Sequence, residues 1–426
     1  MNDEYYKLGG PIFVFIGGEG PTARHWIDTN EGTPDWLKNA KLFNALCFQV
    51  EHRYYGDSHP TPDMSVDNMK YLSSEQALAD LASFVVGMKV KHYIPNAKVI
   101  SFGGSYSGAL SAWFRLKYPH IVNGAVATSA PVEAKVDFKE YLEVVSQALS
   151  GYNSKCRDTV AEATSAIEHL YDTGNQSEID EFTKSLKLCQ PLDNKVKLDV
   201  SNFYATLAGS VMGVVQYSYD NKGVFANKLT IENACRILTN SSGSNNTAIK
   251  RYVDFQRYFM AVNNQTCFEY SYDAEVKALK DESWNGQAAR QWIYQTCTEF
   301  GYYQSSDSQE QPFGHKFDGT FSQRICSDVF GTKFSYEYTA NAVRDTNIYY
   351  GGADLQAMNI VLPNGSLDPW HALSIINASK AHRPTIYIHG TAHCANMYPT
   401  RKEDKNELVA ARLLITKYIN AWLNGQ

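Results

Sequence analysis

A serine in a glycine-rich turn is the residue of this 426-residue chain whose surroundings most favour chemistry. Residues 99–104 form a short apolar run that ends in two glycines, and Ser105 follows. Small and apolar residues then continue at helical spacing to Tyr118. This order predicts a buried strand, a sharp turn and a helix, with the serine on a strained backbone position. Because such a serine attacks acyl carbons once a base removes its proton, we predict that Ser105 is a nucleophile.

A serine nucleophile requires an acid and a base elsewhere in the chain. Matches to the pattern Gly-x-Ser also occur by chance, and the usual pattern has glycine two residues after the serine, where this chain has Ser107. Residues 359–363 predict a buried strand near the end of the chain, and Asp368 follows it. Asp354 precedes this strand and is expected at its opposite end. We therefore predict that Asp368 is the acid.

The base is expected among three histidines near the end of the chain. One follows the acid, and two lie at or beyond the end of the next predicted strand. His371 lies too close to Asp368 in sequence to be its obvious partner, and His389 lies at the edge of the strand. His393 lies beyond it in the loop. Choosing His393 gives the chain order serine, aspartate, histidine that alpha/beta hydrolases show.

Two backbone N–H groups are predicted to stabilise the negative oxygen that forms during such a reaction. The first belongs to Tyr106, at the start of the helix after the nucleophile. The second is expected from the loop around Gly18, which ends the apolar run 10–18. The loop at Tyr54 and Tyr55, which follows another predicted strand, is an alternative source.

The elements around these residues predict an alpha/beta fold. Buried strands near 10–18, 46–50, 99–104 and 124–131 alternate with helices over 74–93 and 106–118, which indicates a mostly parallel sheet covered on both faces. From about residue 132 to 342 the apolar spacing is helical, with no convincing buried strand. We expect an alpha/beta hydrolase fold in two parts, 1–131 and 346–426, with a large helical cap at 132–345 that lies over the carboxyl ends of the strands.

Composition excludes several classes of partner and cofactor. A formal net charge of −6 without long like-charge runs argues against nucleic acid. No apolar run reaches the roughly 18–20 residues of a membrane helix, so we expect no membrane partner. No paired cysteine motif suggests zinc or a redox dithiol, and we expect no metal and no cofactor. The oligomeric state, including a homodimer, stays open.

Cysteines and glycosylation motifs favour an oxidising compartment of the secretory route. Six of the eight cysteines are scattered singly through the middle of the chain, as structural disulfides would be, and the predicted cap is therefore disulfide-bearing. Their pairing is open, and Cys47 and Cys394, beside predicted strands, either pair with each other or stay free. The possible glycosylation sites are Asn175, Asn240, Asn245, Asn264, Asn364 and Asn377.

Several blocks of the chain resemble one family of lysosomal serine peptidases, which contains prolylcarboxypeptidase, dipeptidyl peptidase II and thymus-specific serine protease. The blocks occur in order along essentially the whole chain. They are residues 17–20, 51–56, 103–106, 113–119, 296–301, 364–370 and 392–393. The resemblance implies Ser105 as nucleophile, Asp368 as acid and His393 as base, on an alpha/beta hydrolase fold with a helical, disulfide-bearing cap.

The family resemblance also implies a function and a location. It implies a serine exopeptidase that removes residues near the ends of peptides, in some members after proline, in lysosomes or outside the cell. Residues expected to contact the peptide are Glu19, Tyr54, Tyr55, Trp370 and Met397, with Trp370 as a wall for a proline ring. Relatives have a leader and a strand hairpin before the block that begins here at residue 2, so the chain is expected to lack its beginning.

Departures from the family pattern keep other functions open. Ser107 replaces a glycine, and we expect the turn to survive with modest extra strain. Ala109 and Met397 differ from the larger or aromatic residues expected in a strict proline pocket. The alternatives are a capped serine esterase or lipase with the same three residues, and an inactive relative that serves as a binding protein. The end from which peptides are trimmed is not decided by the sequence.

Overall fold

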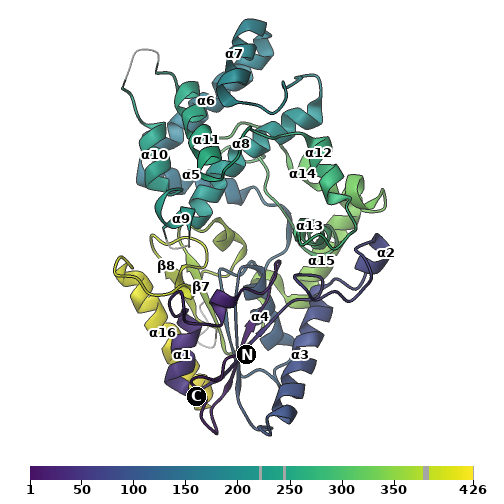
Figure 1. Ribbon diagram of the computed structural model, residues 1–426, viewed down its shortest axis with the longest axis vertical. Helices are drawn as coiled ribbons and strands as arrows, with labels where there is room; N and C mark the ends of the chain where they lie inside the picture. The colour runs from purple at the N-terminus through teal and green to yellow at the C-terminus, as the bar shows by residue number, and fades with distance from the viewer. Residues whose placement is uncertain (220–222, 243–245, 378–382, 426) are drawn as a thin grey trace. The chain divides into compact units, whose positions relative to one another are not determined.

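A single parallel sheet forms the centre of the fold. The computed structural model describes residues 1–219, 223–242, 246–377 and 383–425. Six strands are hydrogen-bonded in the order β2-β1-β3-β4-β7-β8, and every neighbouring pair is parallel. Figure 1 labels β7 and β8 of this sheet. The six strands are β1 (Ile12–Ile16), β2 (Leu46–Val50), β3 (Val99–Gly104), β4 (Gly124–Thr128), β7 (Ile360–Gly365) and β8 (Thr385–Ile388). The predicted strands are therefore confirmed: β2 and β3 have the predicted bounds, β1 and β4 are shorter, and β7 runs two residues further.

The chain divides into two compact units. Unit 1 comprises Met1–Lys135, Asp281–Gly301 and Glu337–Gln426, and unit 2 comprises Val136–Lys280 and Tyr302–Tyr336. The predicted boundaries at residues 132 and 345 stay a prediction. The segment Asp281–Gly301 lies within the predicted cap, 132–345, but belongs to unit 1, which contains the sheet.

Helices of unit 1 cover both faces of the sheet, because its strands are apolar on both sides. Alternate strand residues such as Phe13 and Phe102 pack with Trp36 and Trp422 of the helices α1 and α16. On the other face, Ser101 of β3 hydrogen-bonds Ser111 of α4. The helices of unit 1 are α1 (Asp35–Phe43), α2 (Val66–Met69), α3 (Ser74–Lys91), α4 (Tyr106–Lys117), α13 (Ala289–Gln295), α15 (Tyr336–Tyr350), α16 (Asn406–Leu423), the π-helix η2 (Thr296–Phe300) and the 3-10 turns η1 (Arg24–Trp26), η3 (Gly352–Asp354), η4 (Pro369–Leu373) and η5 (Ala395–Met397).

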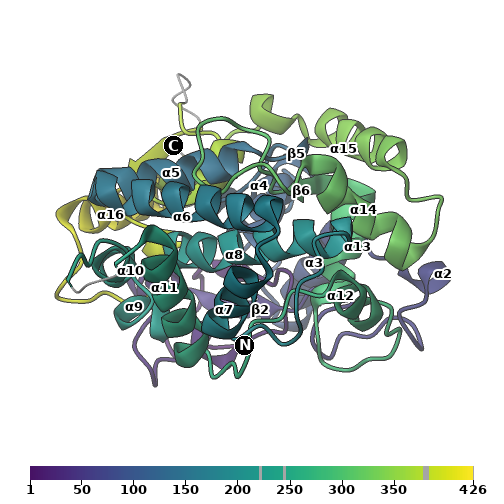
Figure 2. The same ribbon diagram turned by 90° about the horizontal axis from the view of Figure 1, so that it is seen from above.

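Unit 2 is the helical, disulfide-bearing region that the sequence predicts. Helix α5 packs against both α6 and α8 within it (Figure 2). Its helices are α5 (Glu140–Tyr152), α6 (Ser154–Thr173), α7 (Gln176–Leu186), α8 (Lys197–Tyr217), α9 (Val224–Asn227), α10 (Ile231–Leu238), α11 (Ala248–Val262), α12 (Tyr272–Leu279) and α14 (Gly319–Phe330). Two short strands, β5 (Lys135–Asp137) and β6 (Gly301–Tyr303), pair with each other, and the apolar spacing of the sequence predicts neither.

The structure resolves the cysteine alternatives. Cys156 is bonded to Cys235 and Cys189 to Cys267, and both bonds link segments within unit 2. Cys297 and Cys326 are disulfide-bonded as well. Cys47 and Cys394 are free and buried, so they do not pair with each other.

One predicted glycosylation site is wrong. Asn364 lies inside β7 with 1% of its surface exposed, which leaves no room for a glycan in the folded state. Asn175, Asn240, Asn264 and Asn377 are exposed. Asn245 lies outside the described residues.

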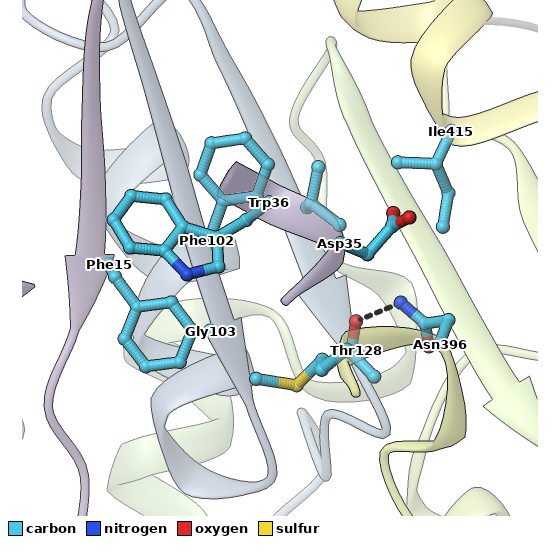
Figure 3. A pocket seen from close by; sticks show the side chains of 10 residues that line it. Phe15, Asp35, Trp36, Phe102, Gly103, Thr128, Asn396 and Ile415 are labelled. Carbon is cyan, nitrogen blue, oxygen red and sulfur yellow. Dashed lines mark hydrogen bonds between the residues drawn. The ribbon is translucent and has the colours of Figure 1, made fainter. Parts of the chain in front are cut away.

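A small cavity of about 20 Å³ lies in the core between the sheet, α1 and the turn after His393 (Figure 3). Its walls include Phe15, Trp36 and Phe102, and Asn396 donates a hydrogen bond to Thr128 Oγ1 at 3.0 Å beside it. Asp35 also lines the cavity, and burial raises the pKa of its carboxyl to about 6. This volume holds about one water molecule, so the cavity is part of the core and cannot hold a peptide.

Arg412 of α16 fixes the chain segment that follows His393. Its guanidinium donates to the carbonyl oxygens of Ala395, Asn396 and Tyr398 at 3.0–3.2 Å. It also forms an ion pair of 2.6 Å with the buried carboxylate of Asp404. One side chain therefore satisfies several backbone groups of an irregular segment that lacks a regular hydrogen-bond ladder.

We expect Arg412→Met to lower the free energy of unfolding by about 3–5 kcal/mol. The variant removes the donor of three carbonyls and the 2.6 Å ion pair of the Asp404 carboxylate, which then keeps, among the described residues, only its contacts with Arg401. Urea denaturation measures the loss of stability. In the control Arg24→Met, the lost ion pair is with Asp28 and the Arg24 side chain is 88% exposed. The control should therefore change stability by less than about 0.5 kcal/mol. Equal losses in both variants would contradict the assigned role.

We expect Asp35→Asn to stabilise the protein at pH 7 and not at pH 4. Because burial raises the pKa of Asp35 from 3.8 to about 6 in the folded state, the folded protein binds a proton in this interval that the unfolded chain does not. The Asp35 carboxyl therefore lowers stability as pH rises through this interval, by up to about 3 kcal/mol above pH 6. Denaturation of both proteins at the two pH values measures the difference. A difference independent of pH would contradict the expectation.

Candidate active site

Ser105 lies on a strained turn between β3 and α4. Its backbone angles are φ 61° and ψ −132°, a region that non-glycine residues adopt rarely. The turn needs glycine before it, because a Cβ at Gly103 would lie 2.0 Å from the carbonyl oxygen of Ser107. The Ser105 N–H donates to the carbonyl of Thr128 on the neighbouring strand β4 at 3.0 Å. Ser105 is half-buried, so its side chain lies at a partly accessible surface.

Ser107 fits the turn through its own hydrogen bonds. Its Oγ donates to the carbonyl of Gly104 at 2.8 Å and accepts from the N–H of Gly104 at 3.0 Å. The close approach to the neighbouring strand falls instead at Gly108, where a Cβ would lie 2.5 Å from the carbonyl of Thr128. The serine that replaces the expected glycine therefore closes the turn.

Asp368 and His393 are brought together by the neighbouring strands β7 and β8. The Nδ1–H of His393 donates to Oδ1 of Asp368 at 2.9 Å. Asp368 has no exposed surface and also accepts from the N–H of Trp370 at 3.0 Å. The loop that carries His393 approaches β7 closely at Gly365, where a Cβ would lie 2.5 Å from the carbonyl of Thr391. Parallel strands end at one edge of the sheet, so this pair lies at the same edge as Ser105.

The charge of His393 depends on its neighbours. Burial lowers the pKa of the imidazole, whereas the Asp368 carboxylate and the adjacent Cys394 raise it, and the net pKa lies well above the usual 6.5. Because Nδ1 is bonded to Asp368, a reaction that exchanges a proton with this ring would use the other ring nitrogen, Nε2.

The alternative acid and bases lie in other surroundings. Asp354 is exposed in η3, at the opposite end of β7. His371 is half-buried and donates from Nδ1 to the carbonyl of Gly365 at 3.2 Å. His389 is exposed.

The predicted oxyanion donors lie on neighbouring elements. Tyr106 is the first residue of α4, where backbone N–H groups have no partner within the helix. Gly18 follows β1, which pairs with β3, and a Cβ at Gly18 would lie 3.3 Å from the Cβ of Ser107 and 3.5 Å from its nitrogen. The loop after β1 therefore lies against the first turn of α4.

Tyr54 and Tyr55, predicted to contact the peptide, have no exposed surface. The hydroxyl of Tyr54 donates to the carbonyl of Asn68, and that of Tyr55 donates to Oε1 of Gln295 at 2.6 Å. The structure therefore places both rings in the packed interior.

The other three predicted contact residues are partly exposed. Glu19 follows Gly18, and burial raises the pKa of its carboxyl, while its own backbone N–H and the charge of His393 lower it. Trp370 lies two residues after Asp368 at the start of η4. Met397 lies beneath the turn, where its sulfur would be 2.2 Å from a Cβ at Gly104.

Sequence reasoning missed a buried polar group behind Tyr106. The hydroxyl of Tyr106 lies 3.0 Å from Nε2 of His52 and 2.9 Å from Nε2 of Gln295. Gln295 in turn donates to Glu299 at 2.9 Å. The blocks at 51–56 and 296–301 contain two of these residues, but their spacing gives no signal of a common partner, because the contacts span up to 189 positions.

The described residues form neither a metal-binding cluster nor a membrane-spanning helix. No three His, Cys, Asp or Glu side chains among those residues are grouped as a metal ion would require. None of the helices built from them is long and apolar enough to cross a bilayer.

Comparison with known proteins identifies relatives along the whole chain. A Caenorhabditis elegans protein with a serine protease name is 39% identical over 100% of this chain and 83% of its own length. Human thymus-specific serine protease is 34% identical over 99% of this chain and 82% of its own. Human lysosomal Pro-X carboxypeptidase is 29% identical over 99% of this chain and 83% of its own length.

A solved structure and a family description complete the comparison. Proline iminopeptidase of Mycobacterium smegmatis aligns with 99% of this chain and 93% of its own, at 11% identity and a TM-score of 0.39. The parallel sheet, the serine turn and the helical, disulfide-bearing region are those of an alpha/beta hydrolase fold with a large insertion. Residues 1–415 match the family described as serine carboxypeptidase S28, and the chain belongs to this family of serine peptidases.

Proposed function

We propose that this chain is a serine exopeptidase that hydrolyses peptide bonds near chain ends through an acyl-enzyme on Ser105. The observation that carries the proposal is the 2.9 Å hydrogen bond between His393 and Asp368, at the edge of the sheet where Ser105 lies on its strained turn. Membership of the S28 family supports the same chemistry.

In the proposed acylation, Nε2 of His393 takes the hydroxyl proton of Ser105 as Oγ attacks the peptide carbonyl. The carbonyl oxygen becomes negative, and the N–H groups of Tyr106 and Gly18 stabilise it. Asp368 holds the imidazole in the required tautomer and stabilises its charged form. The carbon–nitrogen bond then breaks as His393 returns the proton to the leaving amine.

Deacylation uses the same groups in reverse. His393 takes a proton from water, the hydroxide attacks the ester of Ser105, and the second tetrahedral intermediate collapses to release the acid. The proton returns to Oγ of Ser105. Each cycle therefore consumes one water molecule and restores the serine.

The proposed substrates are unstructured peptides. Some of them are proposed to have proline beside the cleaved bond. The name of the human Pro-X carboxypeptidase relative supports this preference, and Trp370 offers a flat apolar ring two residues after the acid. Among the predicted contact residues we retain Glu19 and Trp370 as direct contacts, because both are partly exposed. Met397 is also partly exposed, but it packs against Gly104 beneath the serine turn, so we do not retain it. Tyr54 and Tyr55 are not retained, because neither has exposed surface.

We propose a lysosomal or secreted location. The disulfides require an oxidising compartment in most organisms, and one relative carries a lysosomal name.

We expect the protein to cleave short peptides in a manner that Ser105→Ala abolishes, with a loss of activity of at least about 10³-fold. Mass spectrometry of products from peptides with proline at the second position, at the penultimate position or absent identifies the end that is trimmed. Ester hydrolysis without peptide cleavage would instead favour an esterase. An intact protein that neither cleaves peptides nor reacts with a fluorophosphonate at Ser105 would contradict the proposal.

We expect the activity to fall at acid pH as the His393 imidazole becomes protonated, so the acid limb of the pH profile of activity reports the pKa of His393. Because the Asp368 carboxylate raises the pKa of this imidazole and burial lowers it, Asp368→Asn should move the limb to lower pH. It should also lower the rate by orders of magnitude, since the tautomer is no longer fixed. The pH dependence of Ser105 labelling by a fluorophosphonate measures both changes. In the control His389→Asn, which alters an exposed ring, the limb should not move.

A further inference from the structure

The hydroxyl of Tyr106 is held between two buried side chains. Tyr106 is 1% exposed, His52 4% and Gln295 0%. Aromatic rings of Trp292 and Phe300 pack against the Tyr106 ring, with centroids 5.6 and 5.2 Å away. All five residues belong to unit 1. A buried hydroxyl with two partners fixes the ring to which it is attached.

Donor and acceptor roles in this group follow from one contact. Nδ1 of His52 lies 2.6 Å from the carbonyl of Arg53, so this nitrogen carries the proton and donates. Burial lowers the pKa of His52 to about 4, so the ring is neutral at higher pH and Nε2 is an acceptor. The hydroxyl of Tyr106 therefore donates to His52 and accepts from the amide of Gln295.

The side chain of Gln295 forms two further hydrogen bonds, which fix the amide that contacts the Tyr106 hydroxyl. Its Oε1 accepts from the hydroxyl of Tyr55 at 2.6 Å, and its amide also donates to Glu299 Oε2 at 2.9 Å. The carboxylate of Glu299 accepts from the N–H and the hydroxyl of Ser74, at the first residue of α3. A helix N-terminus favours a negative charge, so α3 holds Glu299, and Glu299 holds the amide of Gln295 in one orientation.

The backbone around Gln295 suits this arrangement. The helix α13 ends at Gln295 and continues as the π-helix Thr296–Phe300, in which Glu299 lies four residues later. π-helical turns are rare and occur frequently at functional sites. The segment Asp281–Gly301 is far from the nucleophile in sequence but clusters with the sheet.

We propose that Gln295 is a positioning residue for the reaction, acting through the hydroxyl of Tyr106 to hold the backbone N–H of Tyr106 as an oxyanion donor. This inference rests on the proposed function. Tyr106 follows Ser105 directly, and its side chain and its N–H are attached to the same Cα, so fixing the ring on one side limits rotation of the peptide group on the other. An oxyanion donor stabilises the transition state only when it is already oriented.

Two variants remove the contact with little change in shape. Tyr106→Phe deletes the hydroxyl, and Gln295→Met keeps the length of the side chain without its amide. In each we expect kcat for peptide cleavage to fall by about 10- to 100-fold with KM little changed, less than the roughly 10²–10³-fold loss for an absent donor. The rate of Ser105 labelling by a fluorophosphonate should fall in parallel, because its phosphoryl oxygen occupies the same position.

Gln291→Met is the matched control. Gln291 lies one turn earlier on α13, is equally buried, and donates to the carbonyls of Tyr54 and Gln287. We expect this variant to lose stability in thermal unfolding, as Gln295→Met does, but to keep the kcat and labelling rate of the original protein. The double variant Tyr106→Phe with Gln295→Met should be no slower than the slower single variant, because both act through one hydroxyl.

The outcomes separate this inference from the proposed function. Normal kcat and labelling in folded Tyr106→Phe or Gln295→Met, beside an active original protein, would overturn the positioning role alone. So would an equal loss of kcat in Gln291→Met, which would indicate a general effect of packing. Failure of the original protein to cleave peptides and to label at Ser105 would overturn the proposed function together with the inference.

Discussion

The structure depends on the strained backbone at Ser105. A φ of 61° at a non-glycine residue persists only where the surroundings determine it more strongly than local preference does. Here the N–H of Ser105 is bonded to β4, the side chain of Ser107 bridges Gly104, and Gly103 allows α4 to pack directly against the strand. The sheet and helix therefore hold the serine outward, with the first N–H groups of α4 behind it.

The proposed acid and base depend on the same sheet, although they lie more than 250 positions along the chain from the serine. β7 and β8 extend the parallel sheet beyond β4, so the loops that follow them open at the edge where β3 ends. Gly365 lets the loop of His393 approach β7, and Arg412 binds the carbonyls that follow. The geometry of Asp368 and His393 is thus maintained by backbone contacts on both sides.

Residues of a segment inside the predicted cap also hold the serine turn, through the side chain of Tyr106. Gln295 and Glu299 connect the N-terminus of α3 to the hydroxyl of Tyr106 through hydrogen bonds in which every group has a definite direction. A buried network of this kind is costly when any member lacks a partner, which makes it rigid when complete. Rigidity at Tyr106 is what the proposed oxyanion donor requires.

The sequence by itself determined the parallel sheet, the helical region and the serine turn, because hydrophobic periodicity and glycine placement are local signals. The order of serine, acid and base stays a prediction from the sequence. The sequence also indicated structural disulfides. Only the tertiary structure decided which cysteines pair, that Asn364 is buried within β7, and that Tyr54 and Tyr55 lie in the packed interior. Only the tertiary structure shows that Gln295 contacts the hydroxyl of Tyr106. These outcomes depend on contacts between positions far apart in the chain, and no local pattern of residue types encodes which distant side chain fills a given space.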